Sequence, residues 1–258
     1  MAGHGVVGWV AGGVGAVLLV HAGPGVAGLD LVRRSMFPGL AGVGRPDHVA
    51  LTFDDGPNPN STPTILETLD VLGWRATFFM LGAMVRRAPR LAAEVAAAGH
   101  EIGLHGDEHR NLLKSGPAST LREVRRGLEA VAEATGQPPR WFRPPYGALS
   151  ATALLAARSL RLRPVLWTTC GNDWDPAATP ASVAAVVRAG LVPGATIVLH
   201  DSAYNSGSDT WRATVGALPL LATYFDAAGL AVGPLAEHDT RSAGRAPRRP
   251  RATGATPG

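Results

Sequence analysis

Short apolar runs alternate along this chain with longer segments whose apolar residues recur at helical spacing. The first pattern predicts buried strands, and the second predicts helices that cover a core. The expected strands are residues 48–53, 77–81, 100–104, 141–143, 164–168, 195–199 and 230–235. The expected helices are residues 62–73, 89–98, 119–135, 150–160, 179–189 and 210–228. This order predicts an α/β fold with a largely parallel sheet and about seven strand–helix units.

Composition fits one main domain, because 258 residues with 46% hydrophobic content can bury one sizeable core. We expect that domain at residues 45–236, after a Gly-rich apolar leader at residues 1–44 and before an Arg/Pro-rich, disordered tail at residues 237–258. The single cysteine, Cys170, excludes an internal disulfide and a cysteine-rich zinc site. Histidines and carboxylates must therefore hold any metal.

The leader contains a stretch, residues 5–29, that has no charged side chain and is long enough to span a bilayer. No positively charged region precedes this stretch, whereas Arg33 and Arg34 follow it, which weakens the case for a signal peptide. Three interpretations stay open: a membrane anchor, a cleaved signal peptide and a soluble leader.

The charge distribution argues against a nucleic-acid partner. The formal net charge is +4, and much of the positive excess lies in the arginines of the tail. The predicted domain shows no basic patch with interleaved aromatic residues, which nucleic-acid-binding domains usually have. We therefore expect no nucleic-acid binding.

Polar residues that can carry chemistry share one position, at or shortly after the carboxyl end of an expected strand. They are Asp54, Asp55, His105, Arg143, Asp173, Trp174, His200 and Asp201. In parallel α/β barrels the carboxyl ends of the strands meet on one face, where active sites are built. These residues are far apart in the sequence, but we expect them to lie together.

Two adjacent carboxylates, Asp54 and Asp55, follow the first of these strands. Gly56 and Pro57 come next and force a turn. Neighbouring side chains at a strand end point in different directions, so the two carboxylates can serve separate roles. A pair that only caps the turn is an equally good interpretation of this segment taken alone.

His105 and His109 are four residues apart, so both imidazoles would face the same side if residues 106–109 begin a helical turn. Two such imidazoles with Asp55 as a third ligand would suit a first-row divalent metal and leave positions open for water and substrate. The alternative is an incidental surface pair of histidines.

Arg143 precedes a rigid turn, Pro144 to Gly147, and can pair with Asp54. Such a turn can also aim a backbone N–H group at a developing oxyanion. The alternative is an ordinary loop arginine.

His200 follows a buried-looking apolar run, and Asp173 is a candidate partner that would raise its pKa, as a general acid near neutral pH requires. A structural histidine is the alternative. Trp174 either lines a small apolar pocket or belongs to the core.

Five segments occur in order between residues 45 and 235: TFDDGP, HGDEH, RPPYG, DW and LH. In these segments the chain resembles the polysaccharide deacetylases, a carbohydrate esterase family that includes chitin, peptidoglycan and nodulation-factor deacetylases. The resemblance implies an irregular (β/α) barrel of about seven units, in keeping with the pattern above.

The resemblance also implies the roles of the first residues. Asp54 would be the general base, oriented by Arg143. Asp55, His105 and His109 would bind a divalent metal, most commonly zinc, with cobalt, nickel or manganese as alternatives. A metal in such a site polarises the acetyl carbonyl and acidifies water.

The remaining roles follow from the same resemblance. The backbone N–H of Tyr146 would stabilise the oxyanion, and Asp173 would tune His200, the general acid. Trp174 and Leu199 would shape the acetyl pocket. Two positions depart from the family pattern: Gly106 stands where a Ser or Thr is usual, and Cys170 where a further Asp is frequent.

The expected reaction is hydrolysis of N-acetyl groups on a glycan that contains N-acetylglucosamine, such as chitooligosaccharide or peptidoglycan. We expect an acetylated polysaccharide as partner, a monomer, and a location in the cell envelope or outside the cell, with residues 5–29 as a candidate anchor. An O-acetyl esterase of the xylan type and a catalytically inactive carbohydrate-binding protein are the alternatives.

Overall fold

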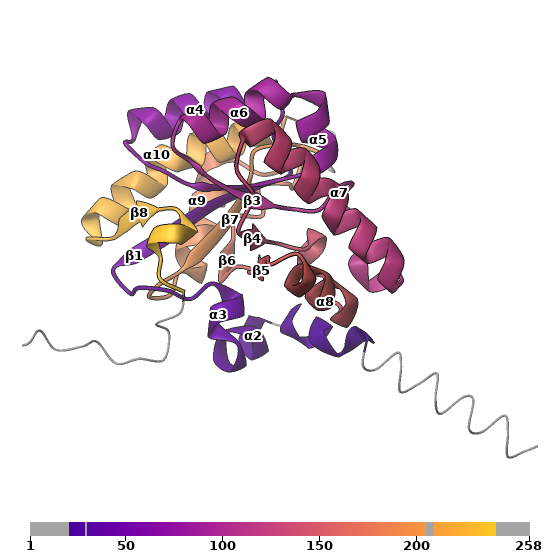
Figure 1. Ribbon diagram of the computed structural model, residues 1–258. Coiled ribbons are helices and arrows are strands. Elements are labelled where there is room, and N and C mark those ends of the chain that lie inside the picture. The colour runs from indigo at the N-terminus through magenta and orange to yellow at the C-terminus, as the bar shows by residue number, and fades with distance from the viewer. Residues whose placement is uncertain (1–20, 29, 205–208, 241–258) are drawn as a thin grey trace, which may run out of the picture.

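The computed structural model describes residues 21–28, 30–204 and 209–240. In this part of the chain, parallel strands form one sheet in the order β5-β4-β3-β2-β1-β7-β6, and β8 pairs with β1 (Figure 1). The strands are β1 (His48–Asp54), β2 (Thr77–Met80), β3 (Glu101–Leu104), β4 (Trp141–Phe142), β5 (Arg163–Pro164), β6 (Thr169–Cys170), β7 (Thr196–His200) and β8 (Ala231–Gly233).

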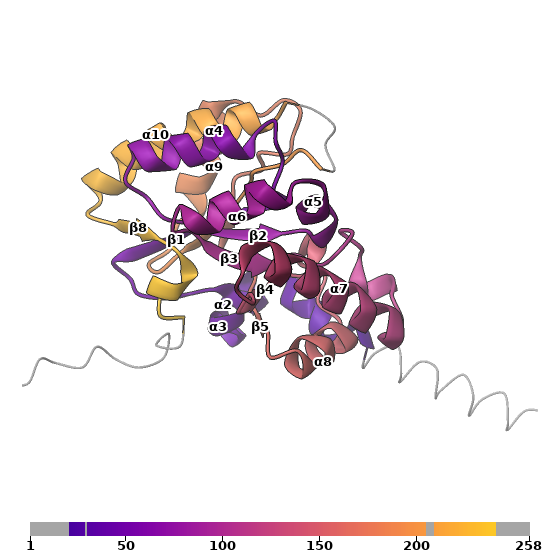
Figure 2. The same cartoon turned by 45° about the horizontal axis from the view of Figure 1, so that its top comes forward.

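Helices lie around the outside of the strands (Figures 1 and 2). They are α2 (Asp30–Met36), α3 (Pro38–Ala41), α4 (Thr62–Val71), α5 (Gly82–Arg87), α6 (Pro89–Ala97), α7 (Pro117–Thr135), α8 (Ala151–Ser159), α9 (Pro180–Gly190) and α10 (Trp211–Ala227). Short 3-10 segments are η1 (Gly23–Gly28), η2 (Leu112–Lys114), η3 (Pro145–Gly147) and η4 (Leu235–Glu237). The predicted α/β class and irregular barrel of about seven units are confirmed.

Strand β1 is buried on both faces. Leu51 and Phe53 belong to the core between the sheet and the helices, where the ring of Phe53 stacks on that of Phe78 with centroids 5.0 Å apart. Because successive side chains of a strand point to opposite faces, Thr52 and Asp54 face the inside of the curled sheet. The alternation therefore aims the last residue of β1 into the barrel.

The sheet is curled because its two edge strands are close in the sequence. Only residues 165–168 separate β5 from β6. Even a fully extended segment of this length spans no more than about 17 Å, so the two edges lie near each other across a narrow seam.

The predicted strand at residues 164–168 is wrong, because partners outside the sheet take up the backbone groups of Leu166 in its middle. The N–H of Leu166 donates to the carbonyl of Leu40 (2.7 Å), and its carbonyl accepts a hydrogen bond from the Arg143 side chain (2.8 Å). No ladder runs through the middle of the segment, and β5 and β6 are two short strands at its ends.

The end of the predicted leader packs across the seam between β5 and β6. Besides the contact of Leu40, the carbonyl of Gly42 accepts a hydrogen bond from the hydroxyl of Thr196 (2.6 Å). Arg33 on α2 is only 1% exposed, and its guanidinium lies 5.4 Å from the ring centroid of Trp167. The boundary at residue 45 stays a prediction, but these contacts attach the segment before it to the barrel.

Within the three described ranges, no helix is long and apolar enough to cross a membrane. Most of the apolar stretch at residues 5–29, namely residues 5–20 and 29, lies outside the described residues, as do residues 241–258 of the predicted tail. The first residues of the predicted tail, 237–240, are described, and His238 among them is fully buried.

Candidate active site

Strands β1 and β7 bring two of the predicted site residues side by side. Asp54 and His200 are register partners at the carboxyl ends of these neighbouring strands. The N–H of Asp201 donates to the carbonyl of Asp54 (3.2 Å), which extends the pairing by one residue. Both side chains therefore reach the same mouth of the barrel, as predicted for the strand ends.

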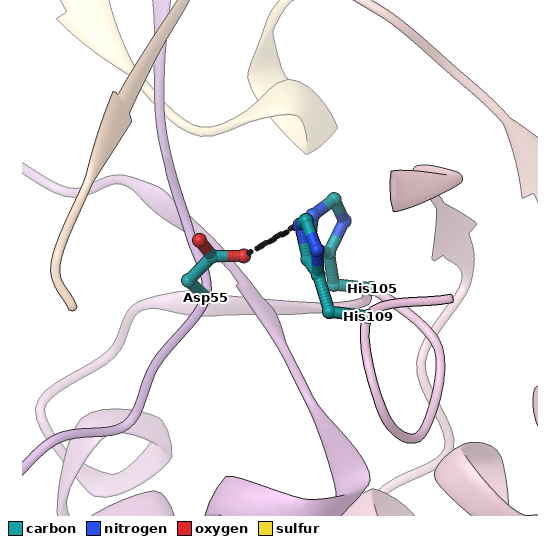
Figure 3. Close-up of side chains that lie close together, drawn as sticks. All are labelled: Asp55, His105 and His109. Atoms are coloured by element: carbon teal, nitrogen blue, oxygen red, sulfur yellow. Dashed lines mark ion pairs between the residues drawn. The ribbon is translucent and has the colours of Figure 1, made fainter. Parts of the chain in front are cut away.

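Asp55, His105 and His109 form a buried cluster at this mouth (Figure 3). One carboxylate oxygen of Asp55, Oδ1, lies 3.4 Å from Nε2 of His105 and 3.2 Å from Nε2 of His109. The three potential ligand atoms lie within 4.8 Å of one another. The backbone of Asp55 is left-handed, with φ of 79°, and this turns its side chain away from the direction that Asp54 takes.

The hydrogen bond of His105 fixes which ring nitrogen faces the cluster. Nδ1 lies 2.8 Å from the carbonyl oxygen of Arg143 and must donate to it, because a carbonyl only accepts. Nε2 of the neutral ring then presents its lone pair to Asp55. Burial lowers the pKa of His105 to about 3, so the ring stays neutral. Two imidazoles and a carboxylate with this geometry fit a first-row divalent metal.

The helical turn that would place both imidazoles on one side does not form at residues 106–109. The backbone is left-handed at Gly106 (φ 97°) and at His109 (φ 54°), and this segment contains no helix. The imidazoles still converge, with ring centroids 5.1 Å apart. A looped path, not helical periodicity, therefore places both rings beside Asp55.

Arg143 is fully buried and pairs with Asp54. One terminal nitrogen, Nη1, donates to Oδ1 of Asp54 and to the hydroxyl of Thr52, both at 2.7 Å. Nη2 donates to the carbonyl of Leu166, and the guanidinium lies 4.0 Å from the ring centroid of Phe79. These contacts hold one carboxylate oxygen of Asp54 in place. The other, Oδ2, lies 3.8 Å from Nε2 of His105.

The pKa of Asp54 is raised above the usual range of a carboxyl group, because burial disfavours its charge more than Arg143 favours it. A raised pKa makes a carboxylate a better proton acceptor. At Asp55 burial acts in the same direction, but the hydrogen bond with His109 and the nearby charge of His200 outweigh it and lower the pKa. The two adjacent carboxylates therefore differ, as base and ligand roles require.

Asp173 holds His200 by two hydrogen bonds. Its Oδ2 accepts from the backbone N–H of His200 (2.7 Å) and from the hydroxyl of Thr214 (2.7 Å), and its Oδ1 lies 2.8 Å from Nδ1 of His200. Burial opposes a charge on His200, but the Asp173 carboxylate outweighs burial and raises the pKa of His200 to about 10. His200 is therefore a protonated imidazolium, able to give up a proton, over the neutral pH range.

Asp54, His200 and the cluster of Asp55, His105 and His109 line one pocket of about 570 Å³. Its wall includes Tyr146 and Trp174, which are 60% and 46% exposed at the rim. The ring of Tyr146 lies edge-on to His109, and that of Trp174 edge-on to His200. The left-handed backbone of Tyr146 (φ 60°) breaks the turn that follows Arg143.

The expectation that Leu199 lines this pocket is wrong. Leu199 is fully buried in the core under the helices, and Val198 lines the pocket instead. The pleat explains the difference, because Val198 and His200 point into the barrel and Leu199 points outward. Ile197, Val198 and Leu199 are all apolar, so the sequence did not show which of these side chains face the inside of the barrel.

The sequence indicated no role for several residues near the pocket, among them Trp167, Cys170 and Asp201. Trp167 lines the pocket, and so does Cys170, whose thiol has a pKa raised by burial to about 12 and stays neutral. Asp201 is buried beside the turn after Asp55, where a Cβ on Gly56 would overlap its carboxyl group. That close approach explains the glycine in TFDDGP. The only signal for Asp201 in the sequence was its position next to His200 at the end of a strand.

A model of the polysaccharide deacetylase family matches residues 41–165. The chain is 37% identical over 154 residues to a chitooligosaccharide deacetylase of Bradyrhizobium sp. (strain ANU 289), and the match covers 59% of this chain and 70% of that relative. Longer curated relatives match over only 32% of their own length. The chain belongs to the polysaccharide deacetylase family. The match confirms the family that the five segments predicted. It also confirms the predicted enzyme class, a hydrolase that removes acetyl groups.

Solved structures agree in fold. The Bc1960 peptidoglycan N-acetylglucosamine deacetylase is similar with a TM-score of 0.71 and 28% identity, over 76% of this chain and 91% of that one. A second similar structure, BA3943 from Bacillus anthracis, is described as a pseudoenzyme of the CE4 family (TM-score 0.68, 26% identity, over 74% of this chain and 65% of that one). The fold therefore occurs both in a deacetylase and in a pseudoenzyme.

Proposed function

We propose that this protein removes the acetyl group from N-acetylglucosamine residues of a glycan, such as chitooligosaccharide or peptidoglycan. A single observation carries the proposal. A carboxylate with a raised pKa and an imidazolium, Asp54 and His200, lie on adjacent strand ends beside the cluster of Asp55, His105 and His109. An amide needs both a base and an acid, because its nitrogen leaves only when protonated.

In the proposed reaction Asp54 takes a proton from the attacking water while Arg143 keeps its carboxylate oriented. The backbone N–H of Tyr146 donates to the oxyanion, and His200, held by Asp173, gives its proton to the departing sugar nitrogen. A divalent metal at Asp55, His105 and His109 would supply Lewis acidity toward the acetyl oxygen and the attacking water. The products are acetate and a free amine.

The finer assignments are also proposals. Zinc is the metal that we propose first, because two imidazoles and one carboxylate with open positions suit it, although cobalt, nickel and manganese use the same ligands. Trp174 and Val198 border the acetyl pocket. A place in the cell envelope or outside the cell follows from a glycan substrate. The monomeric state and the membrane anchor stay predictions.

Replacement of His200 by alanine tests the choice between amide and ester substrates. Without the imidazolium, release of acetate from N-acetylglucosamine oligomers is expected to fall about 10²–10⁴-fold. Acetylated xylan should be affected less, since an alcohol is a better leaving group than an amine. The measurement is acetate release from both glycans by the parent and the variant. An undiminished rate on the N-acetylated oligomers would remove the acid role of His200, and a parent active only on xylan would favour the O-acetyl esterase.

The pair of Asp173 and His200 predicts a pH effect. The Asp173 carboxylate raises the pKa of His200, so Asp173→Asn should lower it, by about 1–3 units. Because the acid must be protonated, activity is lost as pH rises through this pKa, and the alkaline limb of kcat should move to lower pH. Thr214→Val removes a hydrogen bond to Asp173 but no charge, and its pH profile should shift less. An unmoved limb in Asp173→Asn would contradict the assignment.

A further inference from the structure

The loop between the two candidate metal ligands His105 and His109 contains no helix or strand. Contacts with other segments must therefore fix its conformation. Gly106 and His109 both have left-handed backbones, so no intrahelical hydrogen bonds fix the distance between the two imidazoles. The imidazole of His105 is anchored by the carbonyl of Arg143. The path from His105 to His109 depends on contacts made by residues 106–108.

Glu123 on helix α7 supplies the acceptor for this loop. Its Oε1 accepts hydrogen bonds from two successive backbone N–H groups, that of Asp107 (2.9 Å) and that of Glu108 (2.6 Å). The Glu123 side chain is only 6% exposed, so water competes little for these bonds. Hydrogen bonds to a buried carboxylate are short and about twice as strong as those between neutral groups.

The other polar groups of the loop also have partners. The carbonyls of Gly106 and Asp107 accept from the backbone N–H groups at the start of α5, those of Gly82 (3.0 Å) and Ala83 (2.9 Å). The Asp107 carboxylate pairs with Arg86 at 2.7 Å. These contacts hold the loop from the side of α5. From the side of α7, Glu123 accepts its hydrogen bonds and Arg126 pairs with the Asp107 carboxylate at 3.4 Å.

Helix α7 packs directly against the backbone of the loop. A Cβ on Gly127, one helical turn after Glu123, would overlap the carbonyl oxygen of Gly106. This contact explains a glycine inside a long helix, where it is otherwise unfavourable. The Glu123 carboxylate therefore contacts Asp107 and Glu108, and the close approach of Gly127 contacts Gly106, so that helix α7 touches every residue from 106 to 108.

We propose that Glu123 is a positioning residue of the metal site, which sets the affinity for a divalent ion by holding residues 106–108 between His105 and His109. This inference rests on the proposed role of the two histidines as ligands. Groups that orient metal ligands typically contribute 10–100-fold to affinity.

Glu123→Ala tests the proposal through metal affinity, measured with Co²⁺ and Zn²⁺ in competition with a colorimetric chelator. Affinity should fall by about 10–100-fold. Glu129→Ala, an exposed carboxylate on the same helix, is the matched control and should bind as the parent does. Circular dichroism of the metal-free proteins checks that the variants are folded. A folded Glu123→Ala with parental affinity overturns the proposal.

Two conservative variants separate positioning from charge, and they decide the question if Glu123→Ala does not fold. Glu123→Gln keeps the acceptor oxygen and removes the charge, whereas Glu123→Asp keeps the charge and withdraws the oxygen by one methylene. Positioning predicts a smaller loss of affinity for Gln than for Asp; the reverse order overturns it. A parent that binds neither ion would contradict the proposed metal site itself, whereas equal binding by all variants contradicts only the role of Glu123.

Discussion

Replacement of Asp54 by asparagine is expected to leave the metal bound and to lower kcat by about 10²–10⁴-fold. The amide has the size of the carboxylate, and its oxygen can still accept the hydrogen bond from Arg143. It cannot take a proton from water, however, so the proposed base is lost while the proposed ligands Asp55, His105 and His109 are unchanged. Acetate release from N-acetylglucosamine oligomers and metal content on the same sample are the two measurements.

A matched control for Asp54→Asn is Asp175→Asn, because Asp175 is exposed and lies outside the pocket lining. Its rate should equal that of the parent. A parental rate in Asp54→Asn would exclude Asp54 as the base. If the parent itself binds glycan but releases no acetate, the protein is an inactive carbohydrate-binding member of the family.

Replacement of Arg143 by alanine is expected to lower the free energy of unfolding by about 3–5 kcal/mol, because it leaves the buried carboxylate of Asp54 without its countercharge. The carbonyl of Leu166 and the hydroxyl of Thr52 lose a donor as well. Asp54 should then hold its proton to higher pH, so that activity is lost in the fraction that still folds. Urea unfolding of the metal-free protein measures the first effect.

The double variant Arg143→Ala with Asp54→Asn distinguishes a lost charge pair from lost packing. Without the negative charge, removal of Arg143 should cost less, so the two losses should not add. Additive losses would mean that packing against Phe79, not the charge of Asp54, accounts for the effect of Arg143. A loss below about 1 kcal/mol in the single variant would place this pair with weak surface ion pairs.

The predictable parts of the fold and site are those set by local patterns. Long apolar runs gave β1 and β7 nearly to the residue, and the polar residues that follow them meet at one mouth because parallel strands align their carboxyl ends. The expected starts of α8 and α9, residues 150 and 179, also agree with the structure, where Ser150 and Thr179 accept hydrogen bonds from backbone N–H groups of their helices.

The parts that failed depend on contacts between distant segments. Residues 165–168 look like a strand, but Leu40 and Arg143 take the hydrogen bonds that a ladder would use. The spacing of His105 and His109 suggested a helix, but Glu123, distant in sequence, holds an irregular loop there. Helix α5 was missed because it is short and follows directly on a strand.

The covering of the seam between β5 and β6 bears on where a fragment of this protein can be cut. A fragment trimmed to the start of the family match, at residue 41, would keep every strand and every candidate ligand. It would lack Leu40, whose carbonyl accepts a hydrogen bond from the N–H of Leu166. It would also lack Arg33, whose guanidinium lies beside the ring of Trp167 in the pocket wall. Residues that precede the family match therefore pack against the segment that carries Trp167, and a fragment cut at residue 41 would expose the seam that they cover.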